Sequence, residues 1–306
     1  MKHRVVSAGF LPGLREPRAS ALGPEGKFLA VLSRDEWGIW DLESSTREAV
    51  FPIEWERDRL HFEDVSVSRN GRCFAIAIGA RVMIYELDSR SLTDTRFKER
   101  LTALELSPNG TMLAALGESS RIFLLRRDAE QLLLDSTIAV PFPLRTGSAF
   151  AWSPDGCRIA VATPTSAVSF NVIDVESSDI IQLVQHPGFM MMHVTFSGNG
   201  LKLVAIAIVD KPFTALVWDL LTGELESQTR VQGPEDGLHD QALDPCGDYF
   251  ASIREADKTI QIQSIRGGKV VSFGENLGRR VRFGGDGCFL SAWDFEDRIN
   301  LWELDR

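Results

Sequence analysis

The chain has 306 residues, of which 44% are hydrophobic and 25% are charged, a balance that is ordinary for a soluble globular protein. Its formal net charge of −10 excludes a protein whose main task is to grip the phosphate backbone of nucleic acids. No apolar run approaches the roughly 20 residues that a membrane-spanning helix needs, so no membrane partner is expected.

The N-terminal segment, residues 1–14, resembles a secretory signal only superficially. Its apolar stretch is interrupted by Ser7, Gly9, Pro12 and Gly13, which is poor for the hydrophobic region of a signal peptide. We therefore expect the protein to be cytoplasmic.

Beyond this segment, seven tight turns recur along the chain, each a tripeptide that ends in glycine. Successive glycines are 39 to 47 residues apart. In such turns Pro presets φ, Asp or Asn bonds the local backbone, and Gly takes the left-handed position. The turns are Pro24-Glu25-Gly26, Arg69-Asn70-Gly71, Pro108-Asn109-Gly110, Pro154-Asp155-Gly156, Gly198-Asn199-Gly200, Pro245-Cys246-Gly247 and Gly285-Asp286-Gly287.

A fixed pattern of side-chain sizes follows every turn. A large apolar residue stands three positions after each glycine, and a small or slim residue comes next. Small residues are needed where sheets pack face to face near a narrow axis, because bulk there would push the sheets apart. The pairs are Leu29 and Ala30, Phe74 and Ala75, Leu113 and Ala114, Ile159 and Ala160, Leu203 and Val204, Phe250 and Ala251, and Leu290 and Ser291.

Residues 148–184 show how one repeat is built. Ser148–Trp152 alternates apolar residues like a half-buried strand, and the near-continuous apolar run of Arg158–Ala162 fits a strand covered on both faces. A third strand is expected over Ala167–Val175 and an outer fourth strand over Ile180–Val184.

Periods of about 40–45 residues with four short strands each are the signature of a β-propeller. We therefore predict an all-β protein, a single seven-bladed propeller of four-stranded antiparallel blades over residues 1–306. The last repeat has three strands of its own, so Arg4–Ala8 is predicted to supply its outer strand and close the ring. The blades are expected near residues 18–53, 62–96, 101–136, 148–184, 193–229, 239–273, and 280–306 with 4–8.

The third strands carry a further pattern, because several end in an aromatic residue followed by an acid. Trp40-Asp41 and Trp218-Asp219 are the two Trp-Asp pairs, and Asp257–Ile262 reads Asp-x-Thr-Ile-x-Ile. With turns such as Ser153–Gly156, this pattern resembles the WD-repeat β-propeller family over essentially the whole chain. The Gly-His pair that opens a typical repeat of that family is missing, so its buried Asp-His-Ser-Trp hydrogen-bond set is not carried over. The resemblance implies membership of a larger assembly.

The cysteines and histidines favour no particular chemistry. Four cysteines lie beside four different turns, too far apart to bridge, and we expect buried free thiols; they are Cys73, Cys157, Cys246 and Cys288. Neither paired cysteines nor histidines at a metal-ligand spacing occur, so no cofactor or metal is expected. The sequence also contains no nucleophile elbow and no phosphate-binding loop.

Two other functional classes stay open. One is a hydrolase or lactonase-like propeller with a metal in its central channel, for which the candidate ligands are His193, His239, Asp240, Asp244 and Glu105. The other is a sensor module of a signalling switch, which depends on a nucleotide-binding segment that this chain does not contain.

The loops that lead from second to third strands, and from each blade to the next, share one face of a propeller. They carry apolar residues that are either interface anchors or caps folded back over the blades, and arginines that either bind a ligand or form local ion pairs. The predicted contact residues are Trp37, Trp55, Arg57, Arg59, Arg100, Arg145, Phe189, Met191, Phe213 and Arg280.

The sequence therefore predicts a non-catalytic protein-interaction scaffold. Its partners are expected to be proteins or peptides, acidic or phosphorylated because guanidinium groups suit carboxylates and phosphates. We expect a monomeric propeller within a hetero-complex.

Overall fold

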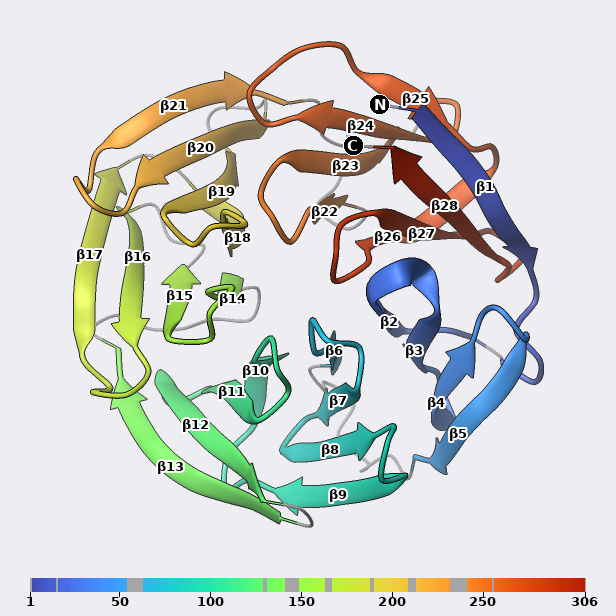
Figure 1. Ribbon diagram of the computed structural model, residues 1–306, viewed down its shortest axis with the longest axis horizontal. Helices are drawn as coiled ribbons and strands as arrows, with labels where there is room; N and C mark the ends of the chain where they lie inside the picture. The colour runs from blue at the N-terminus through green and yellow to red at the C-terminus, as the bar shows by residue number, and fades with distance from the viewer. Residues whose placement is uncertain are drawn as a thin grey trace.

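Seven four-stranded sheets stand around a common axis in the computed structural model (Figure 1). Six sheets contain four consecutive strands paired in chain order, and the seventh joins the first strand of the chain to the last three. The structure describes residues 2–14, 16–53, 63–128, 131–140, 149–162, 167–187, 190–208, 213–231, 241–254 and 256–305. Every strand pairing in these sheets is antiparallel. The protein is thus a seven-bladed β-propeller, which confirms the predicted fold class.

The first four blades follow one another along the chain, each from an inner first strand to an outer fourth. Blade 1 contains β2 (Ala19–Leu22), β3 (Phe28–Leu32), β4 (Glu36–Asp41) and β5 (Thr46–Pro52), with a short 3-10 turn η1 (Pro24–Gly26). Blade 2 contains β6 (Glu63–Val67), β7 (Cys73–Ile78), β8 (Arg81–Glu86) and β9 (Ser91–Arg96). Blade 3 contains β10 (Leu101–Leu106), β11 (Met112–Gly117), β12 (Arg121–Asp128) and β13 (Gln131–Ala139). Blade 4 contains β14 (Ala149–Trp152), β15 (Arg158–Ala162), β16 (Ala167–Asp174) and β17 (Ile180–Pro187).

The last three blades complete the ring. Blade 5 contains β18 (Met190–Phe196), β19 (Lys202–Ile208), β20 (Phe213–Asp219) and β21 (Leu225–Arg230). Blade 6 contains β22 (Gln241–Leu243), β23 (Tyr249–Arg254), β24 (Thr259–Ser264) and β25 (Val271–Phe273). Blade 7 contains β26 (Leu277–Phe283), β27 (Phe289–Asp294), β28 (Ile299–Asp305) and the N-terminal β1 (Lys2–Gly9). Among the described residues, no helix has the length and apolar character of a membrane span.

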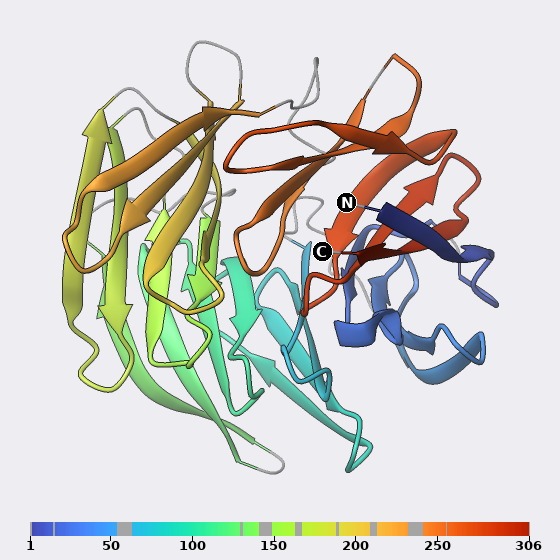
Figure 2. The ribbon, with the colours of Figure 1, turned by 45° about the horizontal axis from the view of Figure 1, so that its top comes forward.

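The two ends of the chain meet in blade 7. Strand β1 pairs antiparallel with β28, so the termini lie side by side (Figures 1 and 2). The register shifts between Val5 and Ser7, which leaves Val6 as a bulge. At the start of β1, the His3 ring stacks on Phe273 of blade 6 with centroids 4.1 Å apart. The predicted closing strand Arg4–Ala8 is therefore confirmed.

Among the recurrent turns between first and second strands, those of blades 2 to 7 share one hydrogen bond, in which the amide of the turn glycine donates to the carbonyl three residues earlier. In blade 3, the Ser107 hydroxyl donates to Oδ1 of Asn109 and accepts from the Met112 amide, and the Gly110 amide donates to the Ser107 carbonyl at 2.8 Å. Gly110 has φ of +73°, a conformation that a residue with a Cβ resists. The sequence signal is thus a turn whose polar side chains satisfy its own backbone.

The hydrophobic core consists of clusters that lie mainly between neighbouring blades. One cluster joins Ala160 and Val172 of blade 4 to Leu203, Leu216 and Trp218 of blade 5. Because second strands are covered on both faces, their residues are almost wholly buried, as the apolar runs predict.

The two residues of a Trp-Asp pair have different roles, because the Trp packs in the core and the Asp binds a turn. Trp218 is buried against Phe170 of the preceding blade, with ring centroids 4.8 Å apart. Asp219 accepts hydrogen bonds from the Leu221 and Thr222 amides at 2.8 and 3.0 Å, and these lower the pKa of its carboxyl group. The acid therefore caps the turn to the fourth strand.

The cysteines correct one expectation. All four are free, but only Cys73 is buried, whereas Cys157 is exposed and Cys246 and Cys288 are half-buried. The difference arises because Cys73 begins a second strand inside a blade, while the other three lie within or directly after the turns at the surface.

Candidate binding surfaces

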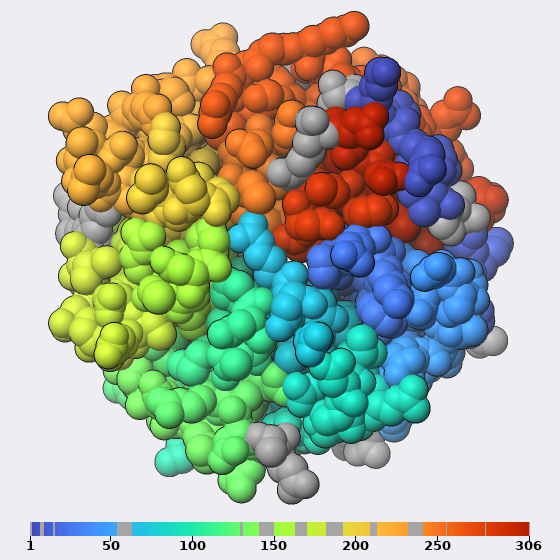
Figure 3. All heavy atoms as spheres, in the orientation of Figure 1, coloured from blue at the N-terminus to red at the C-terminus, as the bar shows by residue number. Residues whose placement is uncertain are grey.

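The disc has two faces, defined by the kinds of connection they carry. The turn face carries the turns from first to second and from third to fourth strands, and the loop face carries all other connections. Figures 1 and 3 look onto the turn face, and Figure 2 shows its hairpins pointing downward.

Two of the residues predicted as contacts on the loop face are core residues, so for them the alternative in which the side chain folds back over the blades holds. Trp37 is 0% exposed and packs on Phe51, with centroids 5.2 Å apart, and in the same cluster lies Phe74 of blade 2. Phe213 is 9% exposed and lies 6.1 Å from Phe250 of blade 6, measured between ring centroids. Both stand at or near the start of a third strand, where the side chain enters the gap between blades.

The remaining predicted contact residues fall into three groups. Arg100, just before β10, and Arg280, in β26, are half-buried. Arg280 adopts a left-handed backbone with φ of +63°. Met191 belongs to β18, but its side chain lies outside what the structure describes. Outside the described residues altogether lie Trp55, Arg57, Arg59, Arg145 and Phe189.

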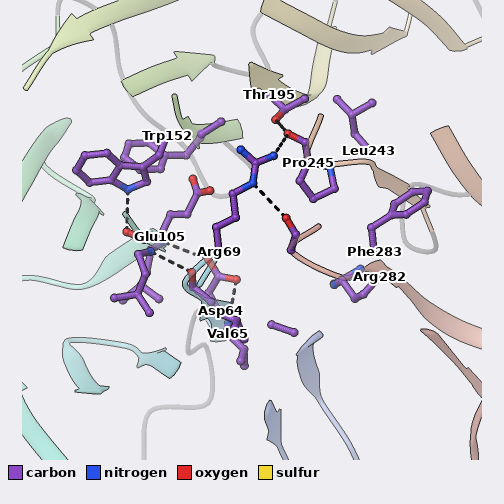
Figure 4. Close-up of a pocket in the computed structure, with 18 of the residues that line it drawn as sticks. Asp64, Val65, Arg69, Glu105, Trp152, Thr195, Leu243, Pro245, Arg282 and Phe283 are labelled. Atoms are coloured by element: carbon purple, nitrogen blue, oxygen red, sulfur yellow. Dashed lines mark hydrogen bonds between the residues drawn. The ribbon is translucent and has the colours of Figure 1, made fainter. Parts of the chain in front are cut away.

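A cavity of about 410 Å³ occupies the axis of the ring (Figure 4). Its walls come mainly from the first strands, whose inner edges are left without a strand partner. The first strands contribute four ionisable side chains to its lining: Asp64 of β6, Glu105 of β10, His193 of β18 and Arg282 of β26. Of the metal candidates named from the sequence, His193 and Glu105 are therefore placed at the axis.

The inner edge of β10 is hydrogen-bonded by side chains of the two adjacent blades. Oδ2 of Asp64 accepts from the Leu104 amide at 3.1 Å, and the Ser66 hydroxyl accepts from the Leu106 amide at 3.0 Å. The Trp152 indole N–H then donates to the Glu105 carbonyl at 3.1 Å. These bonds tie blades 2, 3 and 4 together at the axis, which is the role that a ladder partner would otherwise have.

Burial shifts the protonation of the axial side chains. It raises the pKa of Glu105 to about 8, with the nearby Asp64 charge adding to the effect. Burial also raises the pKa of Asp64 to about 6, although its two hydrogen bonds from backbone amides act in the opposite direction. Burial lowers the pKa of His193 to about 4, and the charge of Arg282 adds to that shift. At neutral pH, Glu105 and His193 are mainly uncharged and Asp64 is mainly ionised.

The other metal candidates are not placed at the cavity. Asp244 is buried and accepts from the Cys246 and Asp248 amides of its own turn at 3.0 and 2.9 Å. His239 and Asp240 lie outside the described residues. In the part of the chain that the structure describes, His, Cys, Asp and Glu side chains nowhere gather in a group of three that could hold a metal ion.

One residue that the sequence reasoning passed over spans the axis. The Arg69 side chain extends across the cavity from blade 2, and its guanidinium donates to the carbonyls of Gly285 at 3.2 Å and Pro245 at 3.5 Å, on blades 7 and 6 (Figure 4). Figure 3 shows the sky-blue β6–β7 segment reaching the middle of the turn face. The sequence does distinguish Arg69, because the other six turns have Pro or Gly at the equivalent position.

Comparison with known structures supports the architecture. The chain is similar to the β-propeller domain of Cps50 (Swd1) from Myceliophteria thermophila, with a TM-score of 0.71 and 18% identity over 99% of this chain and 100% of that one. It is also similar to the hydrazine synthase of Kuenenia stuttgartiensis, with a TM-score of 0.70 and 13% identity over 97% of this chain and 99% of that one. No family model matches the sequence, and no curated protein matches it. Likeness at this level of identity shows the fold alone.

Proposed function

We propose that the protein is a non-catalytic interaction scaffold, a rigid ring that presents its turns and loops to protein partners. The observation that carries the proposal is that side chains at the axis form hydrogen bonds between blades. Asp64, Ser66, Trp152 and Arg69 all hydrogen-bond to the main chain of other blades. Side chains that are hydrogen-bonded in this way hold the ring together, so we assign the binding of protein partners to the turns and loops at the surface.

A divergent WD-repeat origin is part of the proposal. Its support is the turn-capping Asp219 after the buried Trp218, together with similarity to the Cps50 (Swd1) propeller domain. Because of this proposed WD-repeat origin, we expect the protein to be a subunit of a hetero-complex, with a single copy of this chain per assembly.

The test is in vivo cross-linking of the tagged full chain in its native source, followed by mass spectrometry. We expect a reproducible protein partner at fixed stoichiometry. Cross-links from Lys98, just before β10, would assign the loop face, and cross-links from Lys202, beside the blade 5 turn, would assign the turn face. A chain recovered alone at the size of a monomer, or one that carries a stoichiometric metal ion by elemental analysis, would overturn the proposal.

A further inference from the structure

The axial cavity contains polar atoms that the hydrogen bonds between blades leave unused. The side chains of Asp64, Ser66 and Trp152 bond to main-chain groups of neighbouring blades. Three other polar side chains line the same cavity from three different blades and keep atoms available for a ligand. They are Arg69 of blade 2, Glu105 of blade 3 and His193 of blade 5.

The Arg69 guanidinium is a cation whose partners are all neutral. Its Nε donates to the Gly285 carbonyl at 3.2 Å, and its Nη2 lies 3.5 Å from the Pro245 carbonyl oxygen and 3.3 Å from Sγ of Cys246. Its Nη1 bonds to no residue that the structure describes, and no carboxylate among those residues forms an ion pair with it. Figure 4 shows the guanidinium between Glu105 on one side and Pro245 on the other. Arg69 therefore offers a ligand both a hydrogen-bond donor and a positive charge without a counter-charge.

Glu105 and His193 add two more groups without a partner. Oε2 of Glu105 is buried and has no hydrogen-bond partner in the part of the chain that the structure describes, a state that destabilises a fold unless something binds there. The imidazole nitrogens of His193 likewise bond to none of the described residues. Because both side chains are mainly uncharged at neutral pH, each can donate one hydrogen bond without adding charge to the cavity.

The charges around these groups favour an occupant with one negative charge. The Asp64 carboxylate would repel an anion, but its two oxygens accept backbone amides at 3.0 and 3.1 Å. Burial raises the pKa of Asp64, whereas these amides and the nearby charge of Arg282 favour its ionised form. One carboxylate matches the charge of Arg69. A phosphate dianion would bring a second negative charge to a cavity that already holds Asp64, and a buried charge without a counter-charge is costly.

The size and the walls of the cavity indicate the rest of the occupant. Its volume of about 410 Å³ lies within the range of about 300–1,000 Å³ that is typical of small-molecule sites. Apolar residues line it beside the polar ones, among them the half-buried Val65, Phe150 and Leu243. A short apolar body next to the carboxylate therefore suits this space.

The geometry points to a binding site for a small organic acid in the axial cavity, where Arg69 holds the carboxylate and Glu105 and His193 donate hydrogen bonds to it. We define these three residues and the cavity as the axial acid site. The ligand gives partners to atoms of blades 2, 3 and 5 that otherwise lack them. The axial acid site is separate from the surfaces assigned to protein partners, so this inference goes beyond the scaffold proposal and does not depend on it.

The experiment measures the binding of small acids to the full chain by isothermal titration calorimetry at neutral pH. The probes are benzoate, phenylacetate and hexanoate, and each is compared with its primary amide, which has nearly the same shape and no charge. Inorganic phosphate is added as a competitor, because it tests whether the site accepts any anion.

Two variants and one control locate the binding. Arg69→Gln removes the charge, and Ala21→Leu enlarges the cavity wall without removing a polar group. Ala21 lines the cavity at the position in blade 1 that Glu105 has in blade 3, five residues before the turn glycine. The control is Arg158→Gln, because Arg158 also donates to a turn carbonyl of another blade, that of Gly200 at 2.7 Å, and lies outside the cavity lining.

We expect a carboxylate to bind about tenfold or more tightly than its amide, and its affinity to fall about tenfold or more for Arg69→Gln and for Ala21→Leu. The affinity should stay within about twofold for Arg158→Gln. Circular dichroism checks that the variants fold. If Arg69→Gln does not fold, Ala21→Leu decides, because it removes no bond between blades.

Any of four results would refute the axial acid site. These are carboxylates that bind no more tightly than their amides, Ala21→Leu binding as tightly as the wild type, an equal loss for Arg158→Gln, and displacement by an equal concentration of phosphate. Failure of the scaffold proposal looks different, since a chain that is recovered without any protein partner can still bind the acid at its axis.

Discussion

At the scale of single residues, the turn glycines serve two different needs. Gly156 and Gly247 have almost the same backbone, with φ of +73° and +70°. A Cβ on Gly247 would lie 2.7 Å from Cγ2 of Val204 in the neighbouring blade, whereas on Gly156 its nearest neighbour would be 3.8 Å away. Both glycines relieve backbone strain, and only Gly247 also makes room for another blade.

This pair allows the two effects to be separated. We expect Gly156→Ala to lower the free energy of unfolding by about 1 kcal/mol, through left-handed strain alone. Gly247→Ala should lower it by about 2–3 kcal/mol, because the clash with Val204 is added. Urea unfolding measures both, and equal losses would show that the blades can move apart without penalty.

The axial carboxyl group makes stability depend on pH. The pKa of Glu105 is about 8 in the folded chain, against an ordinary value of 4.5. Between these two pH values the folded state therefore binds more protons than the unfolded state. The contribution of Glu105 to the free energy of unfolding is therefore greatest below pH 4.5 and is lost as the pH rises toward 8.

Glu105→Gln removes this titration. We expect the free energy of unfolding of the variant, relative to that of the wild type, to rise by on the order of 2–4 kcal/mol when the pH is raised from about 5 to about 8.5. Taking the difference between two chains at each pH cancels much of the contribution of Asp64 and His193, which are common to both. The measurement is the urea midpoint at both pH values. A difference that is independent of pH would show that Glu105 stays ionised at the axis.

At the scale of elements, the second strands set the spacing between blades. Ala160 of β15 is fully buried and shares a cluster with Leu203 and Leu216 of blade 5. This small residue lets the sheets approach each other near the axis, where the ring is narrowest.

Enlarging that residue should therefore disturb two blades at once. We expect Ala160→Leu to lower the free energy of unfolding by about 1–3 kcal/mol, since the added methyl and methylene groups have no space. The same change at the exposed Ala139 of β13 is the control and should cost less than about 0.5 kcal/mol. Thermal unfolding followed by circular dichroism tests both, and equal losses would contradict the narrow-axis explanation.

At the scale of the whole molecule, closure of the ring depends on β1. This strand covers the edge of β28, and Arg4 forms an ion pair with Glu303 across the pairing at 2.5 Å. Without β1, the edge of β28 would offer unpaired N–H and C=O groups to other chains.

Removal of residues 2–9 should accordingly make the chain aggregate and lower its melting temperature. Light scattering and size-exclusion chromatography measure this. The control, Arg4→Ala, removes the exposed ion pair and keeps the strand, and should change stability by less than about 1 kcal/mol. A truncated chain that stays monomeric and equally stable would show that the ring does not need this strand.

The sequence by itself determined the number of blades, the β15 strand and the closing strand. These follow from local signals, such as the Ser153–Gly156 turn, that repeat every 39 to 47 residues and act within one blade. The tertiary structure alone decided the burial of Trp37 and Phe213 and the reach of Arg69 across the axis. Trp37 and Phe213 are buried partly by the next blade, and Arg69 reaches blades 6 and 7. A periodic pattern carries no information on which side chains of another repeat will meet.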